Sequence, residues 1–108
     1  MGSKILDVKD GNFEQEVLHS NLPVLLDCSA EWCGPCQKMT PIIEEIAQEF
    51  EGRAKVANVD VGAAQETAVR LGVLSVPTVI FFKGGKVQET LIGPAQKSVL
   101  VSRLQRLL

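Results

Sequence analysis

Two cysteines lie three positions apart at the junction between a strand and a helix. The segment Cys33-Gly34-Pro35-Cys36 follows Val24–Cys28, an apolar run that predicts a buried strand. After it, apolar side chains recur at the spacing of an amphipathic helix, at Met39, Ile42, Ile43, Ile46, Ala47 and Phe50. A strand, a short Cys-x-x-Cys turn and a long helix together indicate a redox-active cysteine pair more strongly than the spacing alone.

The length of 108 residues and the formal net charge of −2 limit the class of protein. This length suits a single domain over residues 1–108 that buries its own core, and we expect a monomer. Scattered basic residues give no electrostatic reason to bind nucleic acid, and no apolar run approaches a membrane span. Met1–Ile5 lacks the apolar region of an export signal. The three cysteines fall within nine residues, unlike a secreted disulfide framework, so we expect a cytoplasmic protein.

Strand and helix patterns alternate along the chain and give way to a hairpin near its end. The expected order is β-α-β-α-β-α-β-β-α, which predicts an α/β fold with a mixed sheet between helices. The expected strands cover residues 5–8, 24–28, 54–60, 78–82 and 87–92. Four helices are expected. The first begins at Asn12, and the second and third cover residues 36–50 and 64–71. The last closes the chain and carries leucines at 100, 104, 107 and 108.

Local signals mark the ends of these elements. Asn12, with Gln15 three residues on, predicts a capping box for the first helix. The side chains that this helix should bury are Phe13, Val17 and Leu18. Gly72 is placed to end the third helix in a left-handed conformation, and Gly84-Gly85 is a hairpin signal between two strands.

The two thiols of the Cys-x-x-Cys turn are inequivalent by position. Cys33 is expected at the helix N-terminus, where free N–H groups and the helix dipole lower a thiol pKa from its ordinary value of ~8.5. Cys36 falls one turn further in, three residues before Met39, and joins the buried stripe. We therefore expect Cys33 to attack a substrate disulfide and Cys36 to resolve the mixed disulfide. Pro35 lacks an N–H and suits an early helical position.

Asp27 interrupts the apolar strand six residues before Cys33. A buried carboxyl group has a raised pKa and exchanges protons near neutral pH. We therefore expect Asp27 to accept the proton of Cys36 when that thiol reacts. The alternative is an Asp at a strand end that caps a turn.

Other interpretations of the cysteines stay open. Cys33 and Cys36 have the spacing of half a zinc site, which Cys28 or His19 would complete. The same pair would also be able to hold a metal cluster between two chains. Alternatively, the protein would be a scaffold whose cysteine pair is incidental to its binding role. Apart from these roles, Cys28 is expected to pack in the core as a small apolar residue, and His19 to be a solvated helix end.

The string Ala30-Glu31-Trp32-Cys33-Gly34-Pro35-Cys36, followed by Pro41 and by Val76-Pro77-Thr78, resembles the thioredoxin family over nearly the full length. The resemblance implies a thioredoxin fold, a five-stranded mixed sheet sandwiched between four helices. It implies a thiol–disulfide oxidoreductase that reduces protein disulfides through a redox-active Cys33–Cys36 disulfide, with no bound cofactor. Its partners would be disulfide-containing client proteins and a thioredoxin reductase, commonly a flavoprotein that draws on NADPH.

The resemblance also assigns roles to residues around the cysteines. The apolar groove that receives a client would be lined by Trp32, Gly34, Pro35 and Gly93. Val76 should offer backbone hydrogen bonds to an extended client segment. The residues alone predict a trans bond before Pro77, because most X-Pro bonds are trans, whereas the resemblance implies a cis bond beside the disulfide. Pro41 should kink the long helix.

Two positions depart from the family pattern near Asp27. Ser29 stands where the family usually has an aromatic residue, and Val56 stands where it usually has a lysine. Lys55 lies beside Val56, but adjacent residues of a strand point to opposite faces of the sheet. Asp27 is therefore expected to lack a cationic neighbour, which should leave its pKa more elevated or alter its coupling to Cys36.

Overall fold

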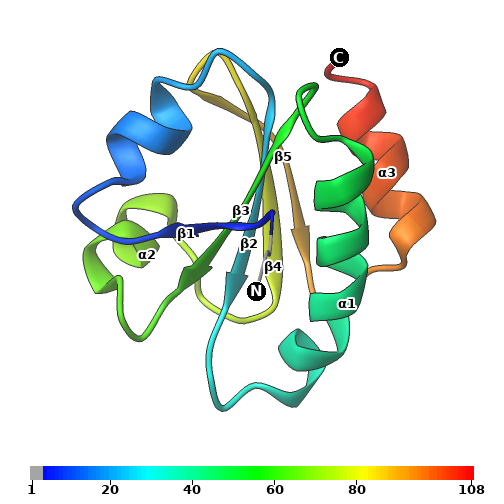
Figure 1. Ribbon diagram of the computed structural model, residues 1–108. Coiled ribbons are helices and arrows are strands. Elements are labelled where there is room, and N and C mark those ends of the chain that lie inside the picture. Colours follow the sequence, from blue (N-terminus) through cyan, green and yellow to red (C-terminus); the bar gives the residue numbers. More distant parts are fainter. Residues whose placement is uncertain (1–3) are drawn as a thin grey trace.

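A five-stranded sheet forms the centre of the computed structural model, which describes residues 4–108 (Figure 1). The strands are β1 (Leu6–Val8), β2 (Val24–Ser29), β3 (Lys55–Asp60), β4 (Thr78–Lys83) and β5 (Lys86–Ile92). They lie in the order β1-β3-β2-β4-β5, with β1 and β2 parallel to β3 and with β4 antiparallel to β2 and β5. The expected mixed sheet is confirmed. The expectation for Met1–Ile5 rests in part on residues 1–3, which lie outside the described residues.

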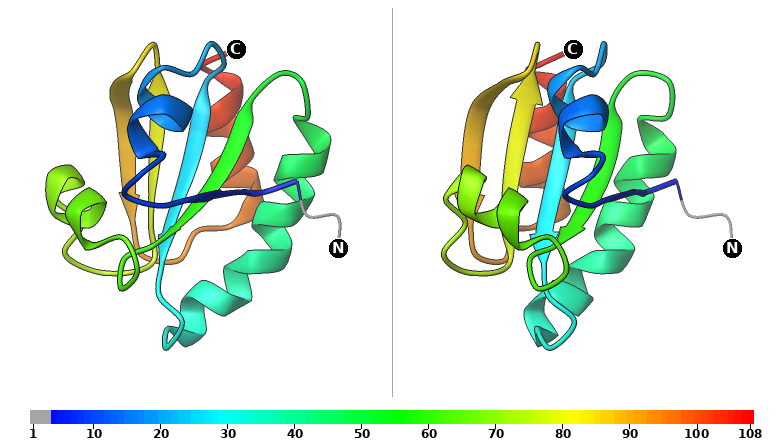
Figure 2. Two further views of the ribbon diagram at one scale, coloured as in Figure 1. Left: turned by 60° about the vertical axis from the view of Figure 1, so that its left-hand side comes forward. Right: turned by 90° about the vertical axis from the view of Figure 1, so that its left-hand side faces the viewer.

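Helices cover both faces of this sheet (Figures 1 and 2). Within residues 4–108 they are a short π-helical segment, η1 (Glu14–Leu18), and three α-helices, α1 (Gly34–Glu49), α2 (Gln65–Leu71) and α3 (Lys97–Gln105). α1 and α3 lie on one face, and η1 and α2 lie on the other. The predicted thioredoxin fold is therefore confirmed. None of the described helices is long and apolar enough to cross a membrane.

An apolar layer fills the space on each face of the sheet. Because successive strand residues point to opposite faces, Leu25 of β2 packs against α1 and α3, whereas Leu26 packs toward η1. The first layer includes Leu25, Met39, Ile43, Ile46, Phe50, Phe81, Leu100 and Leu104. The second includes Val8, Phe13, Val17, Leu26, Cys28, Ile80 and Phe82. β2 is thus buried on both faces, as its continuous apolar run predicted.

The first helix is not capped as the sequence predicted. Asn12 Oδ1 accepts a hydrogen bond from Lys9 N at 2.6 Å, and Asn12 Nδ2 donates to Asp7 O at 3.1 Å. Phe13 occupies the N-cap position with no side-chain hydrogen bond. The capping-box prediction is wrong because the Asn12 side chain bonds to the preceding turn instead, a common alternative for Asn. Of the side chains expected to be buried here, Leu18 is only half-buried.

The other helix ends differ by a few residues from expectation. α1 begins at Gly34, two residues earlier than predicted. α3 ends at Gln105, so Leu107 and Leu108 follow the helix, and Leu108 is half exposed. Gly72 ends α2 with φ of 70°, which confirms the predicted left-handed cap. Pro41 lies inside α1, and the kink expected there stays a prediction.

Candidate redox site

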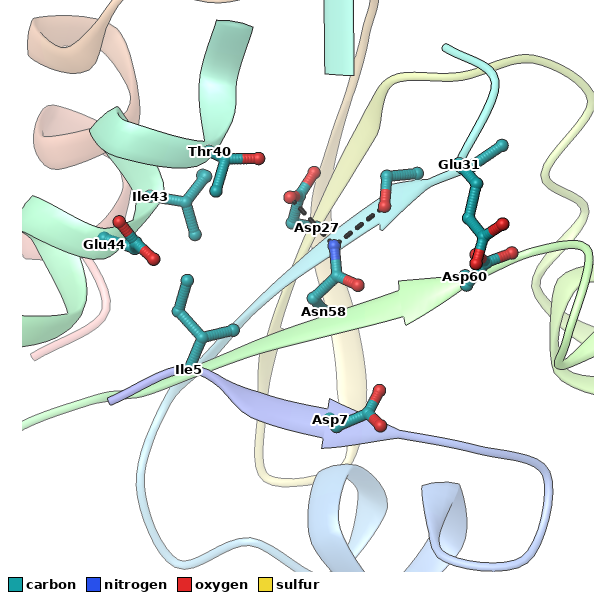
Figure 3. A pocket seen from close by; sticks show the side chains of 11 residues that line it. Ile5, Asp7, Asp27, Glu31, Thr40, Ile43, Glu44, Asn58 and Asp60 are labelled. Atoms are coloured by element: carbon teal, nitrogen blue, oxygen red, sulfur yellow. Dashed lines mark hydrogen bonds between the residues drawn. The ribbon is translucent and has the colours of Figure 1, made fainter. Parts of the chain in front are cut away.

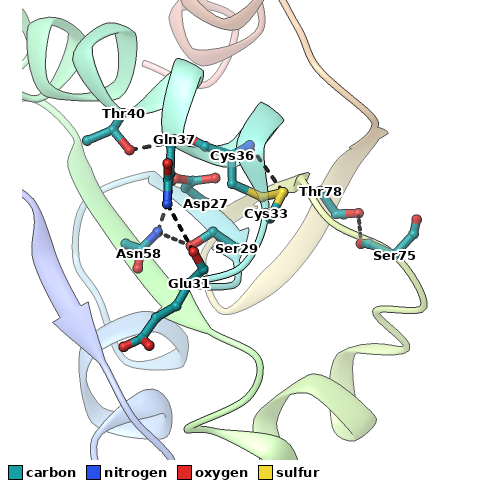
Figure 4. The surroundings of a disulfide bond; sticks show 10 residues. All are labelled: Asp27, Ser29, Glu31, Cys33, Cys36, Gln37, Thr40, Asn58, Ser75 and Thr78. Carbon is teal, nitrogen blue, oxygen red and sulfur yellow. Dashed lines mark hydrogen bonds between the residues drawn. A yellow bond between two sulfur atoms is a disulfide. The ribbon is translucent and has the colours of Figure 1, made fainter.

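Cys33 and Cys36 form a disulfide at the N-terminus of α1, with their Cα atoms 5.3 Å apart (Figure 4). Cys33 has an extended backbone and is the N-cap of the helix. Its Sγ accepts a hydrogen bond from the backbone N–H of Cys36 at 3.1 Å. Pro35 lies in the first turn, where a missing N–H removes no helical hydrogen bond. The positions expected for Cys33, Pro35 and Cys36 are confirmed.

Side chains from neighbouring loops pack around this disulfide, among them Val61 after β3 and Val76 before β4. The two cysteines pack with Ala30, and Val76 contacts the same cluster. The Val76–Pro77 bond is cis, so the trans bond predicted from the residues alone is wrong and the cis bond implied by the family is present. The local preference for trans before proline is only about 0.5–1 kcal/mol, so tertiary packing decides the isomer. Gly93 N donates to Pro77 O at 2.8 Å, which holds the end of β5 against the proline loop.

The residues expected to receive a client differ in their exposure. Trp32 is 79% exposed, and Gly34 and Pro35 are also exposed. Val76 and Gly93 are partly exposed, whereas Pro77 is buried. Two large apolar side chains that the sequence did not single out are also exposed, Leu74 at 98% and Ile92 at 76%. The sequence signal that could have identified them is that Leu74 lies near the Val76–Pro77 segment and Ile92 lies next to Gly93.

Asp27 lies beneath α1 and is only 3% exposed. Its side chain points to the same face of the sheet as Leu25, which packs against α1. Asn58 stands directly opposite in the β2–β3 register, and its Nδ2 donates to Asp27 Oδ2 at 3.1 Å and to Ser29 Oγ at 2.8 Å (Figure 4). Asp27 Oδ1 accepts no hydrogen bond from the described residues. Burial raises the pKa of Asp27 to about 6, and the Asn58 hydrogen bond opposes that rise.

A cavity of about 380 Å³ opens above Asp27 between α1 and β3 (Figure 3). Thr40 and Ile43 of α1 line it on one side, and Ser29 and Asn58 line it on the other. Thr40 is one helical turn after Cys36, and its Oγ1 donates to Cys36 O at 3.4 Å. The cavity therefore joins the Asp27 carboxyl group to the turn of α1 that carries Cys36.

The structure shows where Lys55 and Val56 lie relative to Asp27. Lys55 points away from Asp27, because its Nζ bonds to Glu16 O at 2.9 Å and to Glu16 Oε1 at 3.1 Å. Val56 is buried in the layer next to α1. Among the described residues, no Lys or Arg lines the cavity, and the polar partner of Asp27 is an amide. The sequence reasoning missed Asn58, although its place opposite Asp27 in a parallel neighbouring strand was a usable signal.

The remaining cysteine and the histidine lie apart from this site. Cys28 is fully buried in the layer on the opposite face, and burial raises the pKa of its thiol to about 12. This confirms the prediction that Cys28 packs in the core. His19 is exposed at the C-terminal end of η1. Within residues 4–108, no group of three or more His, Cys, Asp or Glu side chains is arranged to hold a metal ion.

A cysteine pair at the N-terminus of a helix can be oxidised to a disulfide and reduced again by exchange with the disulfide of another protein. The position of the Cys33–Cys36 disulfide therefore places the protein in the class of thiol–disulfide exchange proteins. The family model for thioredoxin matches residues 4–106, and the chain belongs to the thioredoxin family. It is a thiol–disulfide oxidoreductase that reduces protein disulfides through Cys33 and Cys36.

Curated proteins of this family match almost the whole chain. Thioredoxin of Pseudomonas aeruginosa is 40% identical over 104 residues, which are 96% of this chain and 96% of the relative. Thioredoxin of Rickettsia conorii is 43% identical over 100 residues, 93% of this chain and 95% of the relative. Thioredoxin 1 of a Nostoc species is 41% identical over 104 residues, 96% of this chain and 97% of the relative.

Proposed function

We propose that Cys33 is the attacking cysteine and Cys36 the resolving cysteine of this exchange. In the reduced protein, Cys33 Sγ attacks one sulfur of a client disulfide, whose S–S bond breaks and whose other sulfur leaves as a thiolate. Cys36 then attacks Cys33 Sγ, and the second client sulfur leaves as the Cys33–Cys36 bond forms. Two electrons pass from the cysteine pair to the client.

The observation that carries this assignment is the N-cap position of Cys33. Its Sγ already accepts the N–H of Cys36, and the unpaired N–H groups and dipole of a helix N-terminus favour an anion there. A thiolate is the reactive form in exchange, so the stabilised sulfur is the one that attacks. Cys36 is followed at i+3 by the buried Met39 and lies on the inner side of the helix.

Asp27 accepts the proton of Cys36 in the second step. Its pKa of about 6 keeps a useful fraction ionised near neutral pH while leaving it basic enough to take a proton. It lines the cavity that Thr40 shares, one turn from Cys36. A carboxylate without a cationic partner is a stronger base than one in an ion pair, and this supports the assignment.

The client lies across the residues beside the disulfide, most of which are at least partly exposed. Its extended segment pairs with the backbone of Val76, next to the cis bond. Trp32, Gly34, Pro35, Pro77 and Gly93 complete the surface that it contacts. Contact between Val76 and the cysteine cluster, and the hydrogen bond from Gly93 to Pro77, support this placement.

The cellular setting follows from the same chemistry. A thioredoxin reductase returns the Cys33–Cys36 disulfide to the dithiol, and the protein acts as a monomeric electron carrier in the cytoplasm with no bound cofactor. This cycle contributes to cell redox homeostasis. The clustering of the three cysteines, without a framework of structural disulfides, supports a reducing compartment.

Reduction of insulin in the presence of dithiothreitol tests the cysteine roles. Cys33→Ser should abolish the catalysed rate. In a separate reaction without dithiothreitol, pre-reduced Cys36→Ser should accumulate a mixed disulfide between Cys33 and the client, visible by non-reducing electrophoresis. Cys28→Ser is the matched control and should retain the rate, since Cys28 is buried on the other face. An unchanged rate in Cys33→Ser would contradict the mechanism.

A further inference from the structure

The cavity above Asp27 is lined by an unusual share of carboxylates. Those carboxylates are Asp7, Asp27, Glu31, Glu44 and Asp60. Figure 3 shows them arriving from β1, β2, β3, α1 and the segment before Cys33. Among the described residues, no Lys or Arg lines the cavity. The hollow is therefore a concentration of negative charge in a chain whose formal net charge is only −2.

Part of this negative charge has no partner among residues 4–108. Asp7 pairs with Lys9 Nζ at 2.9 Å, and Asp60 Oδ1 accepts two backbone N–H groups. Glu31 and Glu44 are exposed, and neither makes an ion pair within residues 4–108. Two free carboxylates thus stand at the rim.

The floor of the cavity provides a second sign of a missing partner. Asp27 is 3% exposed, and its Oδ1 accepts no hydrogen bond from any described residue. A buried carboxyl oxygen without a donor costs free energy that a nearby positive charge would offset.

The cavity continues toward the redox site. A smaller hollow of about 270 Å³ is lined by Glu31, Trp32, Asp60, Gly62 and Ala63. Glu31 and Asp60 line both hollows, so the two form one surface, which we call the acidic groove. At its far end stands the exposed indole of Trp32, the residue before Cys33.

We propose that the acidic groove is a docking surface for a lysine or arginine side chain near the reacting disulfide of a client, so that this protein prefers clients with basic residues there. The inference rests on the proposed client orientation beside Cys33. Charge complementarity favours a basic side chain as the occupant, because the groove offers carboxylates and an indole face, both of which attract a cation. Complementary rim charges act chiefly on the rate of encounter and weaken as salt is added.

Three synthetic peptides test the preference. They carry the same intramolecular disulfide and differ only in the flanking residues, which are lysine, serine or glutamate. The measured quantity is the second-order rate constant for their reduction by the reduced protein. We expect the rate to fall in the order lysine, serine, glutamate, with a spread of roughly 2- to 5-fold for each carboxylate engaged, as for exposed ion pairs. The spread should shrink at high salt.

A pair of double variants separates the groove from net charge. Glu31→Gln with Glu44→Gln removes the free rim carboxylates, and Glu14→Gln with Glu51→Gln removes the same charge elsewhere. Glu14 lies in η1 on the other face, and Glu51 follows the opposite end of α1, about 24 Å along a helix of this length. The first pair should abolish the preference for lysine and the second should keep it. Neither pair changes a residue of the exchange machinery.

Each outcome has a distinct meaning. Equal loss of preference in both double variants, or no preference in the unaltered protein, would overturn the acidic groove. The serine-flanked peptide reports on the exchange itself, and both double variants should reduce it at the unaltered rate. If the unaltered protein failed to reduce even that peptide, the proposed function would fail instead of the groove.

Discussion

Asn58 Nδ2 donates a hydrogen bond to Asp27 Oδ2 across the parallel β2–β3 register, at a distance of 3.1 Å. The same amide group also bonds to Ser29 Oγ, so its orientation is fixed from two sides. An amide is a weaker stabiliser of a carboxylate than a cation, because it carries a dipole instead of a full charge. Asp27 is thus held in place while its pKa stays near 6.

Removal of the Asn58 amide should raise the pKa of Asp27 further. A hydrogen bond to a charged group contributes about 1.5–3 kcal/mol, so Asn58→Ala should shift the pKa up by about one unit or more. The pH profile of mixed-disulfide resolution should move in the same direction. Titration of the Asp27 carboxyl carbon by NMR measures the shift. Ser29→Ala is the control, because it keeps the bond from Asn58 to Asp27, and an equal shift in both variants would contradict this assignment.

Asp27 should destabilise the folded protein at neutral and alkaline pH. Its folded pKa of about 6 lies above the unfolded value of about 3.9, so the folded state binds the proton more tightly, and the free energy of unfolding falls as pH rises between these values. Asp27→Asn removes this term and should add about 3 kcal/mol of stability at pH 8, with little difference from the unaltered protein below pH 4. Urea unfolding across this pH range measures it. A stability gain that is the same at every pH would contradict the linkage.

Cys28 should stay unreactive in the folded protein. Burial raises the pKa of its thiol to about 12, so almost no thiolate exists near pH 8. Iodoacetamide should therefore modify Cys33 first in the reduced protein, and Cys28 only after unfolding in denaturant. Mass mapping of the alkylated peptides measures the order. Labelling of Cys28 at a rate close to that of Cys33 would show that the core opens locally.

A methyl group should destabilise the hairpin between β4 and β5 less at Gly84 than at Gly85. Gly84 and Gly85 both have positive φ, 62° and 79°. A Cβ at Gly84 would meet nothing within 4 Å, whereas a Cβ at Gly85 would approach Leu18 O to 2.6 Å. Gly84→Ala should cost about 1–2 kcal/mol for the left-handed backbone, and Gly85→Ala about 1–3 kcal/mol more for the clash. Denaturant unfolding of the two variants compares them, and equal losses would contradict the close contact.

Local patterns of apolar residues, with glycine and proline signals at their ends, predicted the strands and helices. The apolar run of β2 and the stripe of α1 could be recognised without any partner element, and the cysteine pair followed from its place between them. Family resemblance was needed for the cis bond before Pro77, since the local preference points the other way.

Features that depend on strand register or on competing hydrogen-bond partners could not be predicted from the sequence. Asn58 meets Asp27 only because β2 and β3 pair in one particular register, across 31 positions of sequence. The Asn12 side chain could bond either to the helix that follows it or to the turn that precedes it, and in the structure it bonds to the turn. The acidic groove collects side chains from separate segments, so no single stretch of sequence displays it.

Because Cys33 Sγ caps α1, each exchange reaction is also an event at the end of a helix. As a thiolate, the sulfur offers the Cys36 N–H a full negative charge; bonded to a client, it offers only a neutral lone pair. The first turn of α1 should therefore be held more strongly when Cys33 is a thiolate than when its sulfur is in a disulfide. Attack on a client thus weakens the N-cap bond to Cys36, the residue that reacts next.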